Sequence, residues 1–294
     1  MTGRKRFATI MMCFIPLIAA EVIQFLMVIP VAGILLLTTF RNQTGATYEE
    51  LVTTLTDALT SVGTSSAVYL LYATATIAIF GFWFLKKFRT DSFYPPKQAF
   101  HPVLLVGLVF AALGWQVLAN YIVELTATIS PHSLEVYERI MESAGFDDMN
   151  FALILYAVFL GPICEELLFR GVTMSLAKKA MPFWLANLFQ ALLFGIFHMN
   201  VIQGVYAFVL GIFMGYICEK GGNILISICF HILYNAWATF APDWFLSGAD
   251  ESTLYFFLWL AAGVLFAGAG ALLFTIGVRK RNEKVNLSRI SADI

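Results

Sequence analysis

Charged residues are scarce in this sequence. Asp, Glu, Lys and Arg make up only 13% of the 294 residues, whereas hydrophobic residues make up 60%. Because a soluble domain has about 25% charged and about 45–50% apolar residues, this composition excludes an ordinary soluble protein. The Lys and Arg residues form short clusters at the ends of hydrophobic stretches and no extended basic stripe, so no nucleic acid partner is expected. The chain is predicted to be a multi-pass integral membrane protein in contact with the lipid bilayer.

Cysteine is rare as well, and no CxxC pair occurs. The four cysteines all fall inside hydrophobic stretches, at Cys13, Cys164, Cys218 and Cys229. This placement argues against a disulfide framework and favours small apolar side chains that fill space between helices. No internal repeat or low-complexity tract is visible.

Long hydrophobic stretches account for most of the chain. Eight candidate spans are bounded by charge, Pro and Gly, at about 7–37, 62–85, 102–125, 151–177, 183–200, 201–219, 223–240 and 253–278. Basic residues precede the first one as in a signal peptide, but it far exceeds the 7–15 apolar residues of a signal-peptide core, so a retained span is expected. The fifth and sixth spans touch end to end, which requires a tight turn or a re-entrant corner. The predicted fold is an all-α polytopic membrane protein of about eight transmembrane helices.

The basic residues predict an orientation and a domain plan. With the N-terminus in the cytoplasm, eight spans place 15 of the 18 Lys and Arg residues inside, including Lys97 and Arg289, so both termini are predicted to be cytoplasmic. The plan is one membrane domain, 1–294, with N-terminal flanking spans in 1–101, a catalytic core in 150–240 and a C-terminal span at 253–278. In a prokaryote the membrane would be the cell membrane.

The stretch GPICEELLFR places three charges inside the fourth span. A charge at the centre of a membrane helix costs about 2.5–3.5 kcal/mol on insertion scales, so such residues usually face the protein interior and mark a working site. On a helix, Glu166 and Arg170 are i and i+4 and share a face, whereas Glu165 is rotated by about 100°. The spacing therefore predicts a Glu166–Arg170 ion pair and a free Glu165, with a kink expected around Pro162.

Two further polar patterns lie at membrane depth. FGIFH ends at His198 in the fifth span, and HILYN places His231 and Asn235 on one face of the seventh. At about 1.5 Å of rise per residue, Glu165, His198 and His231 should all lie near the middle of the bilayer. Each group alone has a structural explanation, as an ion pair that locks helices or as an interhelical hydrogen bond. Together, at one depth, they predict a catalytic or binding site.

Outside these patterns, three polar residues of the first and third spans could line a substrate cavity: Glu21, Asn120 and Glu124. Alternatively, Asn120 and Glu124 reach the external interface. The stretch 133–145 has apolar residues at helical spacing, which predicts a helix on the membrane surface, either a solvated loop helix or a substrate gate.

The three patterns, EExxxR, FxxxH and HxxxN, resemble those of the CAAX protease and bacteriocin-processing family of intramembrane endopeptidases. The resemblance covers about 150–240. It implies hydrolysis of a peptide bond in a membrane-anchored protein or a small peptide, with Glu165 activating water, aided by His198. His231 and Asn235 would stabilise the oxyanion, and Glu166 and Arg170 would fix the helix and the field around Glu165. Prenylated substrates would require a host with prenylation machinery, whereas a prokaryote would offer peptides or membrane regulators.

Alternatives remain open at this point. Members of the family have been described both as metalloproteases and as metal-independent glutamate proteases. If zinc were bound, Glu165, His198 and His231 would be its ligands and Glu166 the base. The chain lacks an HExxH motif, so no cofactor is favoured. A non-catalytic scaffold or bacteriocin-immunity protein of the same fold is the main alternative function. A proton-coupled transporter ranks last, because no inverted repeat is visible.

Overall fold

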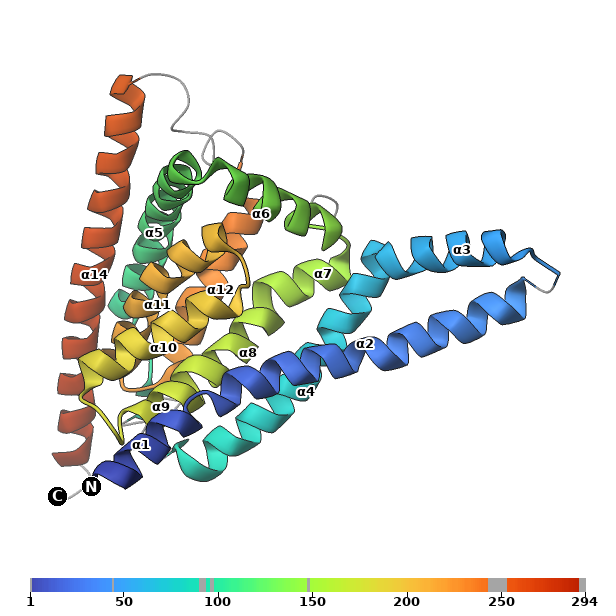
Figure 1. Ribbon diagram of the computed structural model, residues 1–294. Helices are drawn as coiled ribbons and strands as arrows, with labels where there is room; N and C mark the ends of the chain where they lie inside the picture. Colours follow the sequence, from blue (N-terminus) through green and yellow to red (C-terminus); the bar gives the residue numbers. More distant parts are fainter. Residues whose placement is uncertain are drawn as a thin grey trace.

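The computed structural model describes residues 2–43, 45–89, 94–95, 98–146, 149–242 and 253–290, with side chains up to 286. Within these ranges the fold is all α-helical, as predicted (Figure 1). Lys97, the side chain of Arg289 and residues 243–252 of the last predicted external loop lie outside the described part of the chain.

Among the described residues, six helical stretches are long and apolar enough to cross a membrane: Gly3–Asn42, Val62–Lys87, Pro102–Ile129, Phe151–Ala177, Val201–Gly221 and Thr253–Asn286. They correspond to α1 (Gly3–Met12) with α2 (Ile15–Asn42), α4 (Val62–Lys87), α5 (Pro102–Ile129), the segments from α7 to α9, α11 (Val201–Gly221) and α14 (Thr253–Ile290). The predicted spans 183–200 and 223–240 are shorter helices, α10 (Phe183–Phe197) and α12 (Ile224–Phe240). The protein is therefore a multi-pass integral membrane protein, with two of the eight predicted spans below typical spanning length.

Two spans differ in detail from the prediction. The first is broken at Cys13–Phe14, just before Pro16, whose missing N–H interrupts helical hydrogen bonding. The last predicted span, 253–278, is part of a longer helix. This helix, α14, continues past the basic cluster that was expected to end the span and reaches Ile290. All four cysteines are free, as predicted.

Glycines hold α14 against α5. They recur every seven residues on both helices, at Gly107 and Gly114 on α5 and at Gly263, Gly270 and Gly277 on α14. A Cβ on Gly114 would overlap the backbone nitrogen of Ala267, and one on Gly270 would overlap that of Ala111. The seam therefore depends on the absence of side chains, which lets two membrane helices approach at backbone distance.

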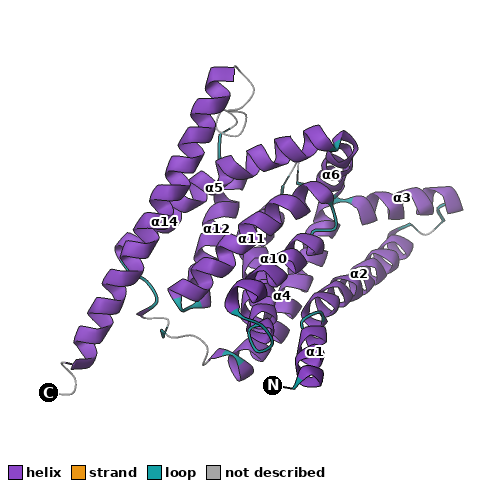
Figure 2. Cartoon of the chain, turned by 60° about the vertical axis from the view of Figure 1, so that its left-hand side comes forward, coloured by secondary structure: helices purple, strands orange, loops and turns teal. Residues whose placement is uncertain are grey.

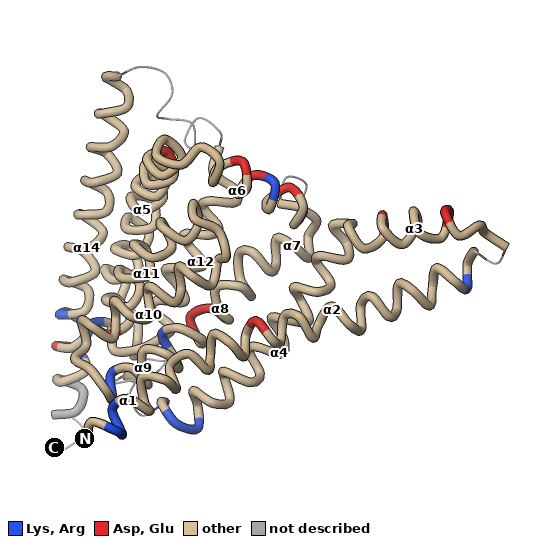
Figure 3. Tube along the Cα trace, in the orientation of Figure 1, with Lys and Arg blue, Asp and Glu red and all other residues tan. Residues whose placement is uncertain are grey.

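Both chain termini lie at the same end of the helical bundle (Figure 1). Figure 2 shows α14 along one side of the bundle. Figure 3 shows most Lys and Arg residues gathered at the end where the termini lie. The acidic residues of α3 (Tyr48–Thr60) and α6 (Pro131–Ser143) lie toward the opposite end. This distribution matches the asymmetry that predicts cytoplasmic termini, and the orientation itself stays a prediction.

Two connections near the site also match expectation. A tight turn joins α10 to α11, in which Met199 has a φ of 57° and the Asn200 side chain caps α11 by accepting from the Gln203 N–H at 2.7 Å. The stretch predicted as a surface helix forms α6, which crosses the end of the bundle farther from the termini (Figure 1).

Candidate active site

The helix that carries EExxxR changes its hydrogen-bonding register twice. Between α7 (Phe151–Leu155), α8 (Gly161–Glu166) and α9 (Met174–Ala177), two stretches are π-helical: η3 (Tyr156–Leu160) and η4 (Leu167–Thr173). π-helical turns are rare, and they occur frequently at functional sites. Glu165 and Glu166 lie between them.

A proline explains how the first π-helical stretch is completed. In a π register each N–H bonds to the carbonyl five residues earlier, as the Gly161 N–H does with Tyr156 O. The next residue is Pro162, which has no N–H, so the carbonyl of Ala157 lacks its helical donor. Asn235 Nδ2 on α12 donates to this carbonyl at 2.8 Å. One amide hydrogen of Asn235 is thereby used to hold the kinked helix, and the second is free of this bond.

Glu166 and Arg170 form the predicted ion pair. Arg170 Nη1 lies 2.8 Å from Glu166 Oε1, and both side chains are fully buried. Arg170 Nη2 also donates to Gly211 O on α11 at 3.3 Å, and the guanidinium carbon lies 4.5 Å from the centroid of the Phe194 ring. Coulombic pairing, hydrogen bonding and a cation–π contact together compensate the burial of this cation.

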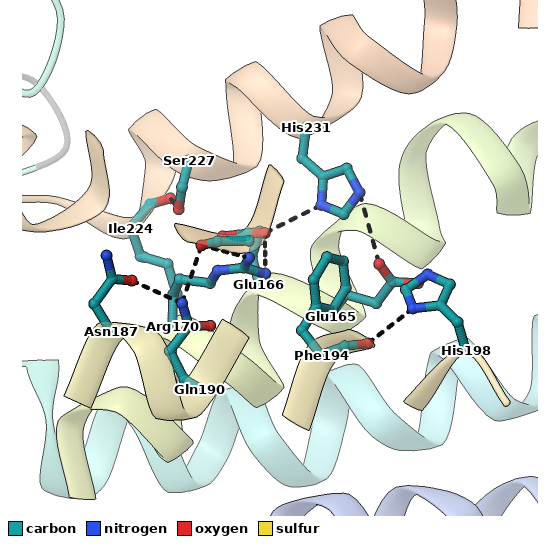
Figure 4. Close-up of polar contacts among 11 residues, drawn as sticks. Glu165, Glu166, Arg170, Asn187, Gln190, Phe194, His198, Ile224, Ser227 and His231 are labelled. Atoms are coloured by element: carbon teal, nitrogen blue, oxygen red, sulfur yellow. Dashed lines mark hydrogen bonds and ion pairs between the residues drawn. The ribbon is translucent and has the colours of Figure 1, made fainter. Parts of the chain in front are cut away.

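His231 connects the ion pair to Glu165. Its Nδ1 donates to Glu166 Oε1 at 3.1 Å, and its Nε2 lies 3.6 Å from Glu165 Oε2 (Figure 4). Since the Glu166 carboxylate can only accept, this bond places the proton on Nδ1 and fixes the orientation of the ring. The result is a continuous chain Arg170–Glu166–His231–Glu165, in which three members are buried and Glu165 keeps 17% of its side chain exposed.

His198 approaches Glu165 from the other side. Figure 4 shows the Glu165 carboxylate between the rings of His198 and His231. His198 Nδ1 donates to Phe194 O at 2.8 Å, so its Nε2 retains a lone pair. The structure thus brings the four sequence-predicted residues Glu165, His198, His231 and Asn235 to one place, where all four line the same cavity.

Two buried amides of α10 escaped the sequence analysis. Gln190 Nε2 donates to Gly211 O at 3.0 Å and to Asn187 Oδ1 at 2.8 Å, and Asn187 Nδ2 donates to Ile212 O at 2.9 Å. Gln190 therefore shares the Gly211 carbonyl with Arg170. The signal for them was in the sequence, because residues 187, 190, 194 and 198 fall on one helical stripe that ends at the histidine.

The cavity has a volume of about 1320 Å³, enough for several residues of a peptide. Glu165, His198, His231 and Asn235 form its floor, and its walls come from α2, α5, α6, α11 and α12. Glu21, Asn120 and Glu124 all line this cavity, and a role in holding substrate stays a prediction. Glu166 and Arg170 do not line the cavity; their fully buried side chains lie in the protein interior next to the lining residues.

The positions of the side chains show whether a metal ion could be held at this site. Within the described residues, no three His, Cys, Asp or Glu side chains are grouped so that they could hold one ion. Glu165, His198 and His231, the residues that would be the ligands if zinc were bound, therefore do not form a ligand set in this arrangement.

Residues 147–237 match the family model described as Rce1-like, type II CAAX prenyl endopeptidase Rce1-like. This region of the chain is therefore similar to that family. The Rce1-like region contains all three polar patterns and runs from the connection before α7 into α12, so the flanking helices lie outside it. Comparisons with curated proteins and with solved structures give no match.

The similarity of this region supports a CAAX-type intramembrane endopeptidase at the level of the family, with a membrane-associated protein or peptide as the class of substrate. The Rce1-like region coincides with the floor of the cavity, whereas much of its wall comes from α2, α5 and α6.

Proposed function

We propose that this protein is an intramembrane endopeptidase in which Glu165 activates the water that attacks a peptide bond. The observation that carries the proposal is the chain of buried contacts from Arg170 through Glu166 and His231 to Glu165, which ends at the floor of a peptide-sized cavity. A purely structural ion pair would need neither the histidine nor the open end of the chain.

Glu165 is the proposed general base. It is the one carboxylate of the EExxxR motif that is open to the cavity, since Glu166 is fully buried and bound to Arg170 and His231. His198 Nε2 is placed to accept a hydrogen bond from the attacking water, because its Nδ1 is committed to Phe194 O. Glu165 would take the proton of the water and deliver it to the leaving amine, a role worth about 10²–10⁴-fold in rate.

His231 and Asn235 are the proposed oxyanion donors. Nε2 of His231 lies on the Glu165 side of the cavity and would donate to the oxyanion as the N–H of an imidazolium, while Nδ1 is held by the Glu166 carboxylate. The second amide hydrogen of Asn235 is the other donor. Fixed donors of this kind, directed at the charge that develops on the carbonyl oxygen, contribute about 10²–10³-fold in rate each.

The decisive experiment replaces the base without changing its shape. Cells that carry the wild-type protein, Glu165→Gln or the control Glu49→Gln, on the exposed face of α3, are compared by mass spectrometry of peptide termini in membranes and medium. We expect a set of termini that disappears only in Glu165→Gln, at equal protein abundance. Identical termini in all three strains would overturn the protease proposal and favour a scaffold or immunity protein.

We further propose that the reaction is metal-independent. Purified protein treated with a strong zinc chelator should keep its activity on a cleaved peptide, because the proposed steps use only protein groups and water. Loss of activity on chelation that zinc restores would contradict this part and assign Glu165, His198 and His231 to a metal.

A further inference from the structure

Arg281 is a buried cation that the proposed reaction does not use. It lies near the C-terminal end of α14, at the end of the bundle that also holds the chain termini (Figure 1). The residue is only 3% exposed, whereas Arg279, Lys280 and Lys284 on the same helix are exposed. None of the ion pairs in the described part of the chain includes Arg281. Because a buried charge is costly unless other polar groups compensate it, the contacts of Arg281 need an explanation.

The Arg281 guanidinium binds backbone carbonyls from two distant parts of the chain. Its Nη1 donates to Gly221 O at 2.7 Å and to Ala99 O at 2.9 Å. Its Nε and Nη2 both donate to Asn282 Oδ1, and the guanidinium carbon lies 3.9 Å from the centroid of the Tyr94 ring. Gly221 is the last residue of α11, and a cation is favourable beside the unpaired carbonyls at the C-terminal end of a helix. Arg281 therefore connects α14 to the end of α11 and to the connection between α4 and α5.

A second set of contacts fixes the turn between α11 and α12. Asn223 caps α12, since its Oδ1 accepts from the Leu225 N–H at 2.9 Å, and its Nδ2 donates to Tyr94 O at 2.7 Å. The Tyr94 N–H donates to Gly222 O at 3.4 Å. The turn is therefore held by the backbone of Tyr94, whose ring lies against Arg281.

This turn leads directly into the helix that carries the proposed oxyanion donors. α12 begins at Ile224 and contains neither Pro nor Gly, so it is expected to move as one rigid element. At about 1.5 Å of rise per residue, His231 and Asn235 lie about 10 and 16 Å along its axis from Ile224. A shift or tilt at the start of α12 would therefore displace both donors relative to Glu165 on α8. A misplacement of about 1 Å at a reacting centre lowers a rate by about 10²-fold.

We propose that Arg281 is a positioning residue for the reaction: it fixes the turn between α11 and α12 and thereby holds His231 and Asn235 in place against the peptide carbonyl. This role rests on the proposed endopeptidase function. The turn and the two donors lie within the Rce1-like region, 147–237, whereas α14 lies outside it. Because Arg281 does not line the cavity, it acts on the rate of the chemical step and not on substrate binding.

The test compares Arg281→Met with Arg279→Met, using purified full-length protein in lipid bicelles and a peptide that the wild-type protein cuts and Glu165→Gln does not. Both substitutions remove one arginine charge from α14, but the Arg279 side chain is 80% exposed and pairs only with Glu283 on the same helix. Arg279→Met is therefore the matched control and should behave as wild type. Arg281→Met should lower kcat by about 10²-fold and leave KM unchanged, because the cavity lining is intact.

Hydrogen exchange read by mass spectrometry gives a measurement that does not depend on activity. In Arg281→Met, the backbone amides of 222–235 should exchange faster than in wild type, while those of α10, 183–197, should be unchanged. Arg281→Lys keeps the charge and can donate to a carbonyl, but it lacks the planar fork of arginine. It should therefore lie between Arg281→Met and wild type both in kcat and in exchange.

The outcomes separate this role from the proposed function. Wild-type kcat in Arg281→Met, or a lower kcat without faster exchange in 222–235, overturns the positioning role and leaves the protease proposal intact. Faster exchange over the whole chain also overturns it, because Arg281 would then stabilise the fold in general; if Arg281→Met does not accumulate, Arg281→Lys is compared with wild type in the same way. Absence of any Glu165-dependent cut overturns the proposed function, and the role of Arg281 in the reaction with it.

Discussion

Substitution of Arg170 by Met removes a fully buried cation and leaves its partner charged. In the wild-type protein Glu166 Oε1 accepts from Arg170 Nη1 at 2.8 Å and from His231 Nδ1 at 3.1 Å. Breaking a buried ion pair by removing one partner costs about 3–5 kcal/mol, because the remaining charge stays uncompensated. Since folded proteins have a free energy of unfolding of about 5–15 kcal/mol, Arg170→Met should lose a large part of its stability.

The partner substitution should reverse much of this loss. In the double variant Glu166→Gln with Arg170→Met no uncompensated charge remains, so we expect it to be more stable than Arg170→Met alone. The free energy of unfolding of wild type, both single variants and the double variant, measured by denaturant titration in mixed micelles, gives the coupling energy directly. Effects of the two substitutions that simply add would refute the interpretation of the pair as mutually compensating buried charges.

The same four proteins separate stability from catalysis. Glutamine at 166 no longer offers a carboxylate to His231 Nδ1, so the imidazole loses the charged acceptor that orients it toward Glu165. We therefore expect the double variant to regain stability but to remain inactive. Recovery of activity together with stability would show that Glu166 acts on the fold alone.

Two further predictions concern packing. Asn235→Leu should lower the free energy of unfolding by about 1–3 kcal/mol, because it leaves the Ala157 carbonyl unpaired. Adding Pro162→Ala supplies an N–H to that carbonyl, so the double variant should recover stability but not activity. If the second change does not stabilise the protein, the assigned contact is contradicted. Gly114→Ala should destabilise the protein by about 1–3 kcal/mol, because its Cβ would overlap the backbone of α14. Gly33→Ala is the control: it has open space around it and should be neutral or slightly stabilising. Equal thermal unfolding temperatures of the two variants would argue against close packing of α5 on α14.

The sequence predicted the helices well because hydropathy and charge act on whole stretches of chain. The span 151–177 coincides with the observed helical stretch Phe151–Ala177, and five other spans match long helices whose starts lie within four residues of the prediction. The predicted spans 183–200 and 223–240 are helices of shorter length. The exceptions have physical causes. Pro16 breaks the first span locally, which a window of average hydropathy does not register, and α14 continues past its basic cluster because charged residues end a membrane span without ending a helix.

The candidate site was predictable in the helix faces that meet there, but not in its contacts. Helical spacing separated Glu165 from Glu166 and paired Glu166 with Arg170, as the structure confirms. The bond between Glu166 and His231 depends on how two helices cross, and sequence spacing within each helix carries no information about the crossing. The π-helical stretches are equally invisible to hydropathy, because a change from i−4 to i−5 hydrogen bonding leaves the apolar character of the segment unchanged.

The different roles proposed for the adjacent Glu165 and Glu166 follow from whether each carboxylate has a buried cation beside it. Arg170 neutralises Glu166 at the protein interior, so this pair adds no net charge to the buried layer of the fold. The charge of Glu165 has no such partner in the EExxxR motif, and it lies instead at the surface of a cavity, beside two imidazoles. A peptide that fills the cavity displaces water from around Glu165 and strengthens every electrostatic interaction there. On the proposed mechanism, the glutamate that is costly to place in a membrane becomes most effective when the substrate covers it.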